Sequence, residues 1–156
     1  MPALGLPVGT TAPDFLLADH RGGKVQLSSF RGKSAVLLVF FPYAFTNVCS
    51  SEFTALSAHV KKLHLRGVEI LGISCDSPYA LAEFALRNEI GIDLLSDHWP
   101  HGNVCREYEV FLEDKGFAMR ASFLIDQQGH IVWTLLQGPA EQRDPAAYDA
   151  AVDALA

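Results

Sequence analysis

The longest apolar run in the chain covers residues 35–41 and reads AVLLVFF. A run of this length is typical of one β-strand that is buried on both faces, and Pro42 ends it because proline lacks the N–H that a sheet needs. Apolar residues then recur at steps of three and four, the spacing of one helix face. They are Cys49, Phe53, Leu56, Val60 and Leu63. The pattern predicts a central strand and then a helix that continues to about Leu65 and ends at Gly67.

A second strand and helix follow. Residues 68–74, which read VEILGIS, are mostly apolar and predict the next strand. Ser77 is suited to be the N-cap of the next helix and Pro78 its first residue, because proline there loses no hydrogen bond. Three shorter elements come next: a strand at 92–95, a loop rich in ring side chains at 96–102, and a helix from about 103 to 108.

Hairpin patterns occur at both ends of the chain. Residues 11–17 and 24–27 predict two strands around a turn at 21–23. Residues 117–126 alternate, so that Arg120, Ser122 and Leu124 share one side of a strand. Its predicted hairpin partner places Ile131, Trp133 and Leu135 on a single side. A last helix is expected to start at Pro145, capped by Asp144.

The order of these elements predicts the fold class. Strand, helix, strand, helix and strand imply right-handed crossovers and a parallel portion, and the late hairpin makes the sheet mixed. The expected architecture is an α/β, thioredoxin-like fold with a mixed central sheet, flanking helices and an N-terminal β-hairpin extension. The length of 156 residues suits one domain, 1–156.

Composition and charge exclude several classes of protein. Hydrophobic residues make up 49% of the chain, so a disordered protein is excluded. The formal charge of −6 with dispersed basic residues argues against nucleic acid or anionic membranes as partners. No apolar run approaches a membrane span, and residues 1–5 lack the features of a signal peptide. A cytoplasmic location is therefore expected.

The three cysteines, Cys49, Cys75 and Cys105, are an odd number, so at least one is free or bonded to another molecule. Their spacing gives no C-x-x-C pair, and the six histidines show no H-E-x-x-H motif. No metal site is expected from these spacings. Free thiols suit the reducing cytosol.

Cys49 is the first candidate for chemistry. Its predicted place in the first turn of a helix, with Thr46 or Asn47 as N-cap, surrounds it with unpaired N–H groups and partial positive charge. Both favour a thiolate, which is the nucleophilic form of cysteine. The simpler interpretation is a small buried apolar residue at a strand–helix junction. The Thr46 hydroxyl and the Pro42 ring, which can reach and cover the sulfur, favour the reactive interpretation.

Pro42, Thr46 and Cys49 together form the pattern P-x-x-x-T-x-x-C, within LLVFFPYAFTNVCSSE. Four further segments match the same family: VGTTAPDF, GISCDSP, LLSDHWPHG and RASFLID. In these segments the chain resembles the peroxiredoxins, and in particular their one-cysteine AhpE (alkyl hydroperoxide reductase E) type. The resemblance covers nearly the whole chain. It implies a thioredoxin-like fold, a thiol-dependent peroxidase that needs no cofactor, and a homodimer.

The resemblance also implies roles for individual residues. Cys49 would be the peroxidatic nucleophile and would become a sulfenic acid. Thr46 would position the peroxide, Pro42 would wall the pocket, and the N–H groups of Val48 and Cys49 would face the oxygens. Arg120, in RASFLID, would hydrogen-bond the sulfur and the peroxide, since a guanidinium offers several fixed donors. Its alternative is an edge-strand arginine in solvent.

Further residues are implied less directly. Glu52 would orient Arg120, or else only complement the start of the helix. Arg143 would be a second arginine of the site, or else a surface arginine. Phe45 and Trp99 would line the substrate pocket, and Trp99 could instead lie at a subunit contact. The two histidines of the same loop are expected to be solvated rather than to act as bases.

Regeneration of the enzyme is the step that the sequence leaves most open. Thr54 stands where one peroxiredoxin group has its resolving cysteine, and no cysteine follows Cys105. Cys105 could resolve Cys49 only if its Cα came within about 7 Å, and Cys75 is expected to be structural. An external thiol or a redoxin is therefore the expected reductant.

Two other functions are considered. A thioredoxin-like disulfide oxidoreductase would need C-x-x-C, whereas the chain reads Cys49-Ser50-Ser51-Glu52. A peroxide sensor, redox relay or oxidation-driven chaperone would use Cys49 without high turnover, and measured turnover would separate it from an enzyme. Hydrogen peroxide, organic hydroperoxides and peroxynitrite all remain candidate substrates.

Overall fold

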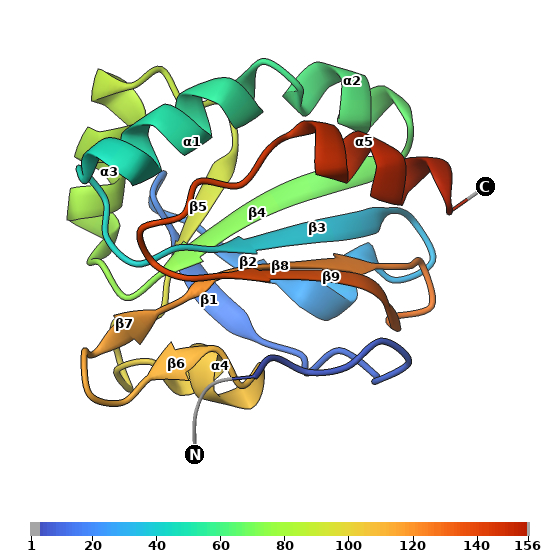
Figure 1. Cartoon of the computed structure of the whole chain (residues 1–156), viewed down its shortest axis with the longest axis horizontal. Coiled ribbons are helices and arrows are strands. Elements are labelled where there is room, and N and C mark those ends of the chain that lie inside the picture. The colour runs from blue at the N-terminus through green and yellow to red at the C-terminus, as the bar shows by residue number, and fades with distance from the viewer. Residues whose placement is uncertain (1–3, 156) are drawn as a thin grey trace.

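The structure is a computed structural model that describes residues 4–155 (Figure 1). Its main sheet has seven strands in the order β2-β1-β5-β4-β3-β8-β9. The strands are β1 Leu16–Asp19, β2 Lys24–Gln26, β3 Ala35–Phe40, β4 Val68–Ser74, β5 Asp93–Ser96, β8 Arg120–Ile125 and β9 Ile131–Gln137, and a small separate hairpin contains β6 Phe111–Leu112 and β7 Phe117–Ala118. The helices are η1 Leu27–Phe30 (a 3₁₀ turn), α1 Asn47–Ser57, α2 Val60–Leu65, α3 Pro78–Arg87, α4 Asn103–Glu107 and α5 Ala146–Asp153.

The predicted central strand lies in the middle of the sheet. Every residue of β3 is buried. It pairs in parallel with β4 and antiparallel with β8. Strands β1 and β2 form the predicted antiparallel hairpin, and the pairing of β1 with β5 joins this hairpin to the sheet. The mixed α/β sheet with flanking helices is thus confirmed. Because β3 and β4 run in parallel, their carboxyl ends meet at one edge, where the segments after Phe40 and Ser74 lie close together.

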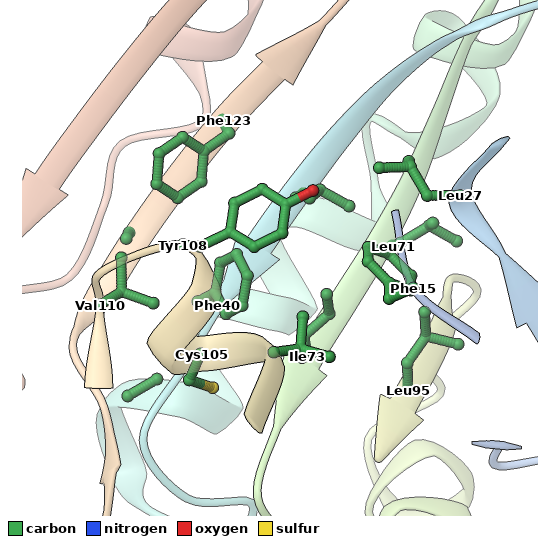
Figure 2. Packing of buried hydrophobic residues seen from close by; sticks show 14 of the residues in the cluster. Phe15, Leu27, Phe40, Leu71, Ile73, Leu95, Cys105, Tyr108, Val110 and Phe123 are labelled. Atoms are coloured by element: carbon green, nitrogen blue, oxygen red, sulfur yellow. The ribbon is translucent and has the colours of Figure 1, made fainter. Parts of the chain in front are cut away.

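The sheet separates two apolar cores. Alternate residues of β3 point to opposite faces, so Val39 belongs to one core and Phe40 to the other. Helices α1, α2, α3 and α5 cover the first face, and α4 with the β6–β7 hairpin covers the second (Figure 1). In the second core the ring of Tyr108 packs against Phe40 and Phe123, with centroids 5.3 and 5.4 Å away (Figure 2).

The predicted helix from Cys49 to Leu65 is two helices. The interruption falls at Ala58 and His59, between α1 and α2. The Ser57 hydroxyl donates to the Phe53 carbonyl at 2.7 Å, and the His59 N–H donates to the Leu56 carbonyl at 2.9 Å. Such local side-chain bonding competes with the helical ladder and bends helices. The apolar periodicity continues across the break, which is why the pattern predicted one helix.

Two strand predictions were also wrong in detail. Strand β1 begins at Leu16 and pairs with β2 and β5, whereas Thr11 forms only an isolated bridge to His130, next to β9 at the other edge of the sheet. Ile131 and Trp133 were expected on the same side of β9. The register shifts between Leu124 and Ile125, so that Leu124 pairs with Trp133 while Ile125 pairs with Ile131. This bulge places the two β9 side chains in different cores.

The remaining boundaries differ by only a residue or two. The predicted strand at 117–126 is divided at Met119 into β7 and β8, and the last helix begins at Ala146. The Asp144 carboxylate does accept a bond from the Ala146 N–H, at 3.0 Å. Within residues 4–155, no helix has the length and apolarity that crossing a bilayer requires. Residues 1–3, on which the expected lack of a signal peptide partly rests, and residue 156 lie outside the described range.

Candidate active site

Cys49 lies in the first turn of α1, and Thr46 is the N-cap. Thr46 has extended backbone angles, and its hydroxyl oxygen accepts a hydrogen bond from the Cys49 N–H at 3.2 Å. The same hydroxyl donates to the Tyr43 carbonyl at 3.3 Å. Cys49 is fully buried. Of the two N-caps considered, the structure therefore uses Thr46, which holds its hydroxyl next to the backbone of the cysteine.

The loop from β3 to α1 is fixed from two sides. Pro42 is buried directly after the central strand. The Ala44 N–H donates to the Asp76 carboxylate at 2.9 Å, and Asp76 follows the end of the neighbouring strand β4. Phe45 has a left-handed φ of 72°, which is strained for a residue with a side chain. Its ring is half exposed and packs edge-on against Phe84 at 5.4 Å.

A buried cluster of two arginines and one glutamate lies against this helix. Arg120 and Arg143 are each 1% exposed and Glu52 is 2% exposed. Arg120 donates from Nη1 to Glu52 at 3.0 Å and from Nε to the Pro139 carbonyl at 2.7 Å. Arg143 donates to the Glu52 carboxylate from Nε at 2.9 Å and from Nη2 at 2.6 Å. Both arginines are therefore held by one carboxylate from the second turn of α1.

Neither arginine lies at the surface. For Arg120 the alternative of an edge strand in solvent is wrong, because β9 pairs beyond β8 and covers it. For Arg143 the alternative of a surface arginine is wrong, because the segment before α5 passes beneath α1 and its backbone N–H also donates to Glu52, at 2.8 Å. Residues 138–145 have no apolar period, so the hydrophobic pattern did not predict this burial. The family resemblance was the signal that pointed to Arg143 as a site residue.

The charges in the cluster stabilise one another. Burial alone would raise the pKa of Glu52, but the hydrogen bonds and charge of Arg143, together with the charge of Arg120, lower it. Burial alone would lower the pKa of Arg143, yet the pKa is raised because the Glu52 carboxylate accepts its hydrogen bonds and attracts the cation. The cluster thus holds a net positive charge beside Cys49.

Two further residues, neither of them a predicted site residue, extend the cluster. Arg143 Nη1 donates to the Ser122 hydroxyl at 3.1 Å, and this hydroxyl lies 2.8 Å from that of Tyr148. Burial raises the pKa of Tyr148, so its hydroxyl keeps its proton. The alternation of residues 117–126 predicted that Ser122 shares one side of the strand with Arg120. This pattern was the feature of the sequence from which a role for Ser122 in the site could have been predicted.

Other candidate residues do not meet at this site. Cys75 and Cys105 belong to the core on the α4 side of the sheet, whereas Cys49 belongs to the core on the α1 side. A hydrogen bond from the Cys105 thiol to the Cys75 sulfur, together with burial, raises the pKa of the Cys105 thiol. Trp99 is 79% exposed, and it lies between β5 and α4, on the second face. Of the two suggested pocket rings, Phe45 directly precedes the helix that carries Cys49, and the pocket role of Trp99 stays a prediction.

This geometry agrees with comparisons against known proteins. The model of the AhpC/TSA family matches residues 8–134 of the chain. The chain belongs to the AhpC/TSA family. Alkyl hydroperoxide reductase E of Mycobacterium tuberculosis (strain ATCC 25618 / H37Rv) is 40% identical over 150 residues, which cover 96% of this chain and 98% of that protein.

More distant members of the family agree. Peroxiredoxin Bcp of Escherichia coli (strain K12) is 36% identical over 132 residues, covering 81% of this chain and 83% of that protein. The crystal structure of the reduced 2-Cys peroxiredoxin of Plasmodium vivax has a TM-score of 0.85 and 34% identity, covering 95% of this chain and 81% of that chain. This AhpC/TSA member is accordingly a peroxiredoxin, a thiol-dependent peroxidase with a thioredoxin-like fold.

Proposed function

We propose that Cys49 is the peroxidatic residue of this enzyme. Its thiolate attacks one oxygen of the hydroperoxide, so that an S–O bond forms while the O–O bond breaks. The other oxygen leaves with the electron pair, takes up a proton and departs as water or an alcohol. Cys49 is then a sulfenic acid. Two equivalents of an external thiol, or one reduced redoxin, return it to the thiol and release water and a disulfide.

The surrounding residues have separate tasks in this reaction. The Cys49 N–H already donates to Thr46, so the Val48 N–H is the backbone donor proposed for the peroxide. Thr46 positions the peroxide through its hydroxyl, and buried Pro42 keeps water from the sulfur. Two of the guanidinium nitrogens of Arg120 bond Glu52 and Pro139. Among residues 4–155, this leaves Nη2 of Arg120 for the sulfur and the departing oxygen.

The observation that carries this proposal is the buried Arg120–Glu52–Arg143 cluster against α1, the helix with Cys49 in its first turn. Burying three charged side chains is costly and is weak evidence for stability by itself. Its location against the helix that carries Cys49 places positive charge where a reaction that develops negative charge on sulfur and oxygen requires it. Glu52 and Arg143 are therefore proposed as positioning residues.

We also propose a one-cysteine mechanism. The sheet lies between Cys49 and the other two thiols, which argues against Cys105 as a resolving residue in the same chain. All three cysteines are free, which suits a cytoplasmic enzyme that has thiol reductants available. The substrates proposed are hydrogen peroxide, organic hydroperoxides or peroxynitrite, and the assembly proposed is a homodimer.

The test is peroxide consumption with a dithiol reductant in steady state. Cys49→Ser is expected to abolish turnover, whereas Cys75→Ser is expected to retain it within about twofold. Circular dichroism would establish that both variants are folded. Full turnover in the Cys49→Ser protein would overturn the proposal. A wild-type protein that reacts once with peroxide and then stops would favour the sensor or relay instead of the enzyme.

A further inference from the structure

Three potential metal ligands meet on the face of the sheet away from Cys49. They are Cys75, just after β4; Asp97, just after β5; and Cys105, in α4. One ligand atom from each, the two sulfurs and a carboxylate oxygen, lie within 4.8 Å of one another. The residues are 8%, 1% and 0% exposed. The peroxidase reaction proposed above uses none of them.

The Asp97 carboxylate is already oriented. One oxygen accepts the Val104 N–H at 3.1 Å and the other accepts the Cys105 N–H at 2.8 Å. A carboxylate has about four lone-pair sites, so each oxygen can still bind a metal. Carboxylates that ligate metals are held in this way by surrounding hydrogen bonds.

In the described part of the chain, Asp97 also has no cation within ion-pair distance. Within residues 4–155, no lysine or arginine forms an ion pair with it. A buried carboxylate without a cation is costly, in contrast to Glu52, which has two arginines. A divalent cation bound between Asp97 and the two sulfurs would supply the missing charge.

The donor set selects the kind of metal. Two sulfurs and one carboxylate oxygen suit zinc, whereas calcium and magnesium prefer oxygen ligands alone. Zinc bonds of about 2.0–2.3 Å in a tetrahedron place the ligand atoms roughly 3.3–3.8 Å apart. The observed spacing, at most 4.8 Å, would need only small side-chain rotations to reach this geometry.

We propose that Cys75, Asp97 and Cys105 form a binding site for a divalent, thiophilic metal ion of the zinc type. Binding releases the thiol protons, and a water molecule takes the fourth position on the side of Cys75, the most exposed of the three residues. The Cys105 sulfur points from α4 towards strand β4 (Figure 2). The ion would thus link α4 to the ends of β4 and β5. The sequence spacing concealed this site because each ligand comes from a different element.

The site has a consequence for the fold. Asp76, next to Cys75, holds the Ala44 N–H of the loop before Cys49, and the Ser74 hydroxyl donates to the Asp76 carboxylate at 2.7 Å. A metal that fixes Cys75 therefore also fixes the strand end that anchors this loop. Saturating zinc should raise the thermal midpoint of unfolding by several degrees, because a ligand that binds only the folded state stabilises it.

The test uses fully reduced Cys49→Ser protein, in which the other thiol is absent. Zinc content after dialysis against zinc and then buffer is expected to be about one ion per chain, and Co²⁺ is expected to give sulfur-to-metal charge-transfer absorption in the near ultraviolet. A second substitution in this protein, Cys75→Ser or Cys105→Ser, should weaken zinc binding at least tenfold. It should also lower the charge-transfer absorption of the Co²⁺ form, because one of the two sulfur ligands is lost. Asp97→Asn should weaken binding while both sulfurs still absorb. Glu107→Gln, an exposed change on the same helix, should bind like the parent.

Two outcomes would overturn the proposal. One is zinc binding that is unchanged in both cysteine variants, since the metal would then lie elsewhere. The other is a zinc content below about a tenth of an ion per chain in fully reduced, folded protein. This result would count against the site even if Cys75 and Cys105 form a disulfide on oxidation. Circular dichroism of each variant separates lost ligands from lost structure. Because Cys49 is absent throughout, failure of this test would leave the peroxidase proposal untouched.

Discussion

Glu52 is the residue on which the polar part of the site converges. It accepts hydrogen bonds from Arg120 Nη1 and from three nitrogens of Arg143, and it is almost completely buried. Removing one member of such a cluster leaves the others charged and unpaired in the interior. Glu52 therefore determines both where Arg120 points and whether the segment with Arg143 stays in place.

Glu52→Gln is expected to destabilise the protein by about 3–5 kcal/mol near neutral pH, measured by urea unfolding. The pKa of Glu52 is lowered in the folded state, so its stabilising contribution is complete above the ordinary glutamate pKa and is lost as pH falls through the folded value. The difference between wild type and variant should accordingly shrink in acid.

The matched control is Glu83→Gln, whose carboxylate pairs with Arg87 on the exposed face of α3. An exposed pair of this kind contributes about 0.5 kcal/mol or less. If Glu52→Gln and Glu83→Gln had equally small effects, or if the Glu52 difference did not change with pH, the interpretation of Glu52 would be wrong.

At the scale of elements, α5 contributes to the site through one hydroxyl. Tyr148 reaches Ser122 of β8, which in turn accepts a bond from Arg143. The chain of contacts from Tyr148 to Arg120 therefore joins α5, β8 and α1. Tyr148 reaches Arg143 through the Ser122 hydroxyl, and we therefore treat Tyr148 as a positioning residue.

Tyr148→Phe is expected to cost about 1 kcal/mol in the free energy of unfolding, since it removes one buried hydrogen bond but keeps the ring. The kcat/KM for peroxide should fall several-fold, because Arg143 would be held less firmly once Ser122 loses its Tyr148 partner. The pH profile of the reaction should shift as well. The control is Tyr79→Phe, because Tyr79 is 87% exposed. A Tyr148→Phe enzyme that is less stable but has unchanged kinetics and pH profile would reduce Tyr148 to a structural role.

The elements that the sequence predicted well are those that local chemistry decides. The run at 35–41, the proline after it and the cap at Thr46 placed Cys49 correctly, because strand burial, proline and capping act over a few residues. The break near Ser57 and the bulge beside Ile125 were missed, since single hydrogen bonds and register shifts leave the apolar pattern unchanged. Whether Arg143 is buried could not be decided from the hydrophobic pattern for a related reason. Its partner Glu52 is distant in sequence, and the segment around Arg143 has no apolar periodicity.

At the scale of the whole molecule, the central sheet separates the proposed peroxidase site from the proposed metal site. Cys49 and its arginines lie on the face that α1 and α5 cover, and the Cys75–Asp97–Cys105 cluster lies on the face that α4 covers. Exposed rings remain at two loops, with Phe45 46% and Trp99 79% exposed. Large exposed rings are enriched at protein interfaces. These loops are therefore the candidate surfaces for assembly.

We expect sedimentation equilibrium to show a homodimer, and Trp99→Ala to raise its dissociation constant at least tenfold. Replacing a buried interface tryptophan by alanine often costs 2 kcal/mol or more of binding free energy, which corresponds to about a thirtyfold rise in the dissociation constant. Leu65→Ala is the control, since Leu65 is 76% exposed at the end of α2, away from both loops. A wild-type chain that remains monomeric at high concentration would contradict the expectation, and equal effects of the two changes would exclude Trp99 as the contact.

The most direct test of the peroxidatic role of Cys49 is the intact mass of the reduced protein after one equivalent of hydrogen peroxide. Gain of one oxygen atom, located at Cys49 with a sulfenate-specific reagent, is the predicted result and would establish the one-cysteine mechanism. Loss of two hydrogen atoms, with a disulfide that includes Cys49, would contradict the separation of thiols by the sheet. No rapid change in mass would mean that Cys49 is an ordinary buried thiol.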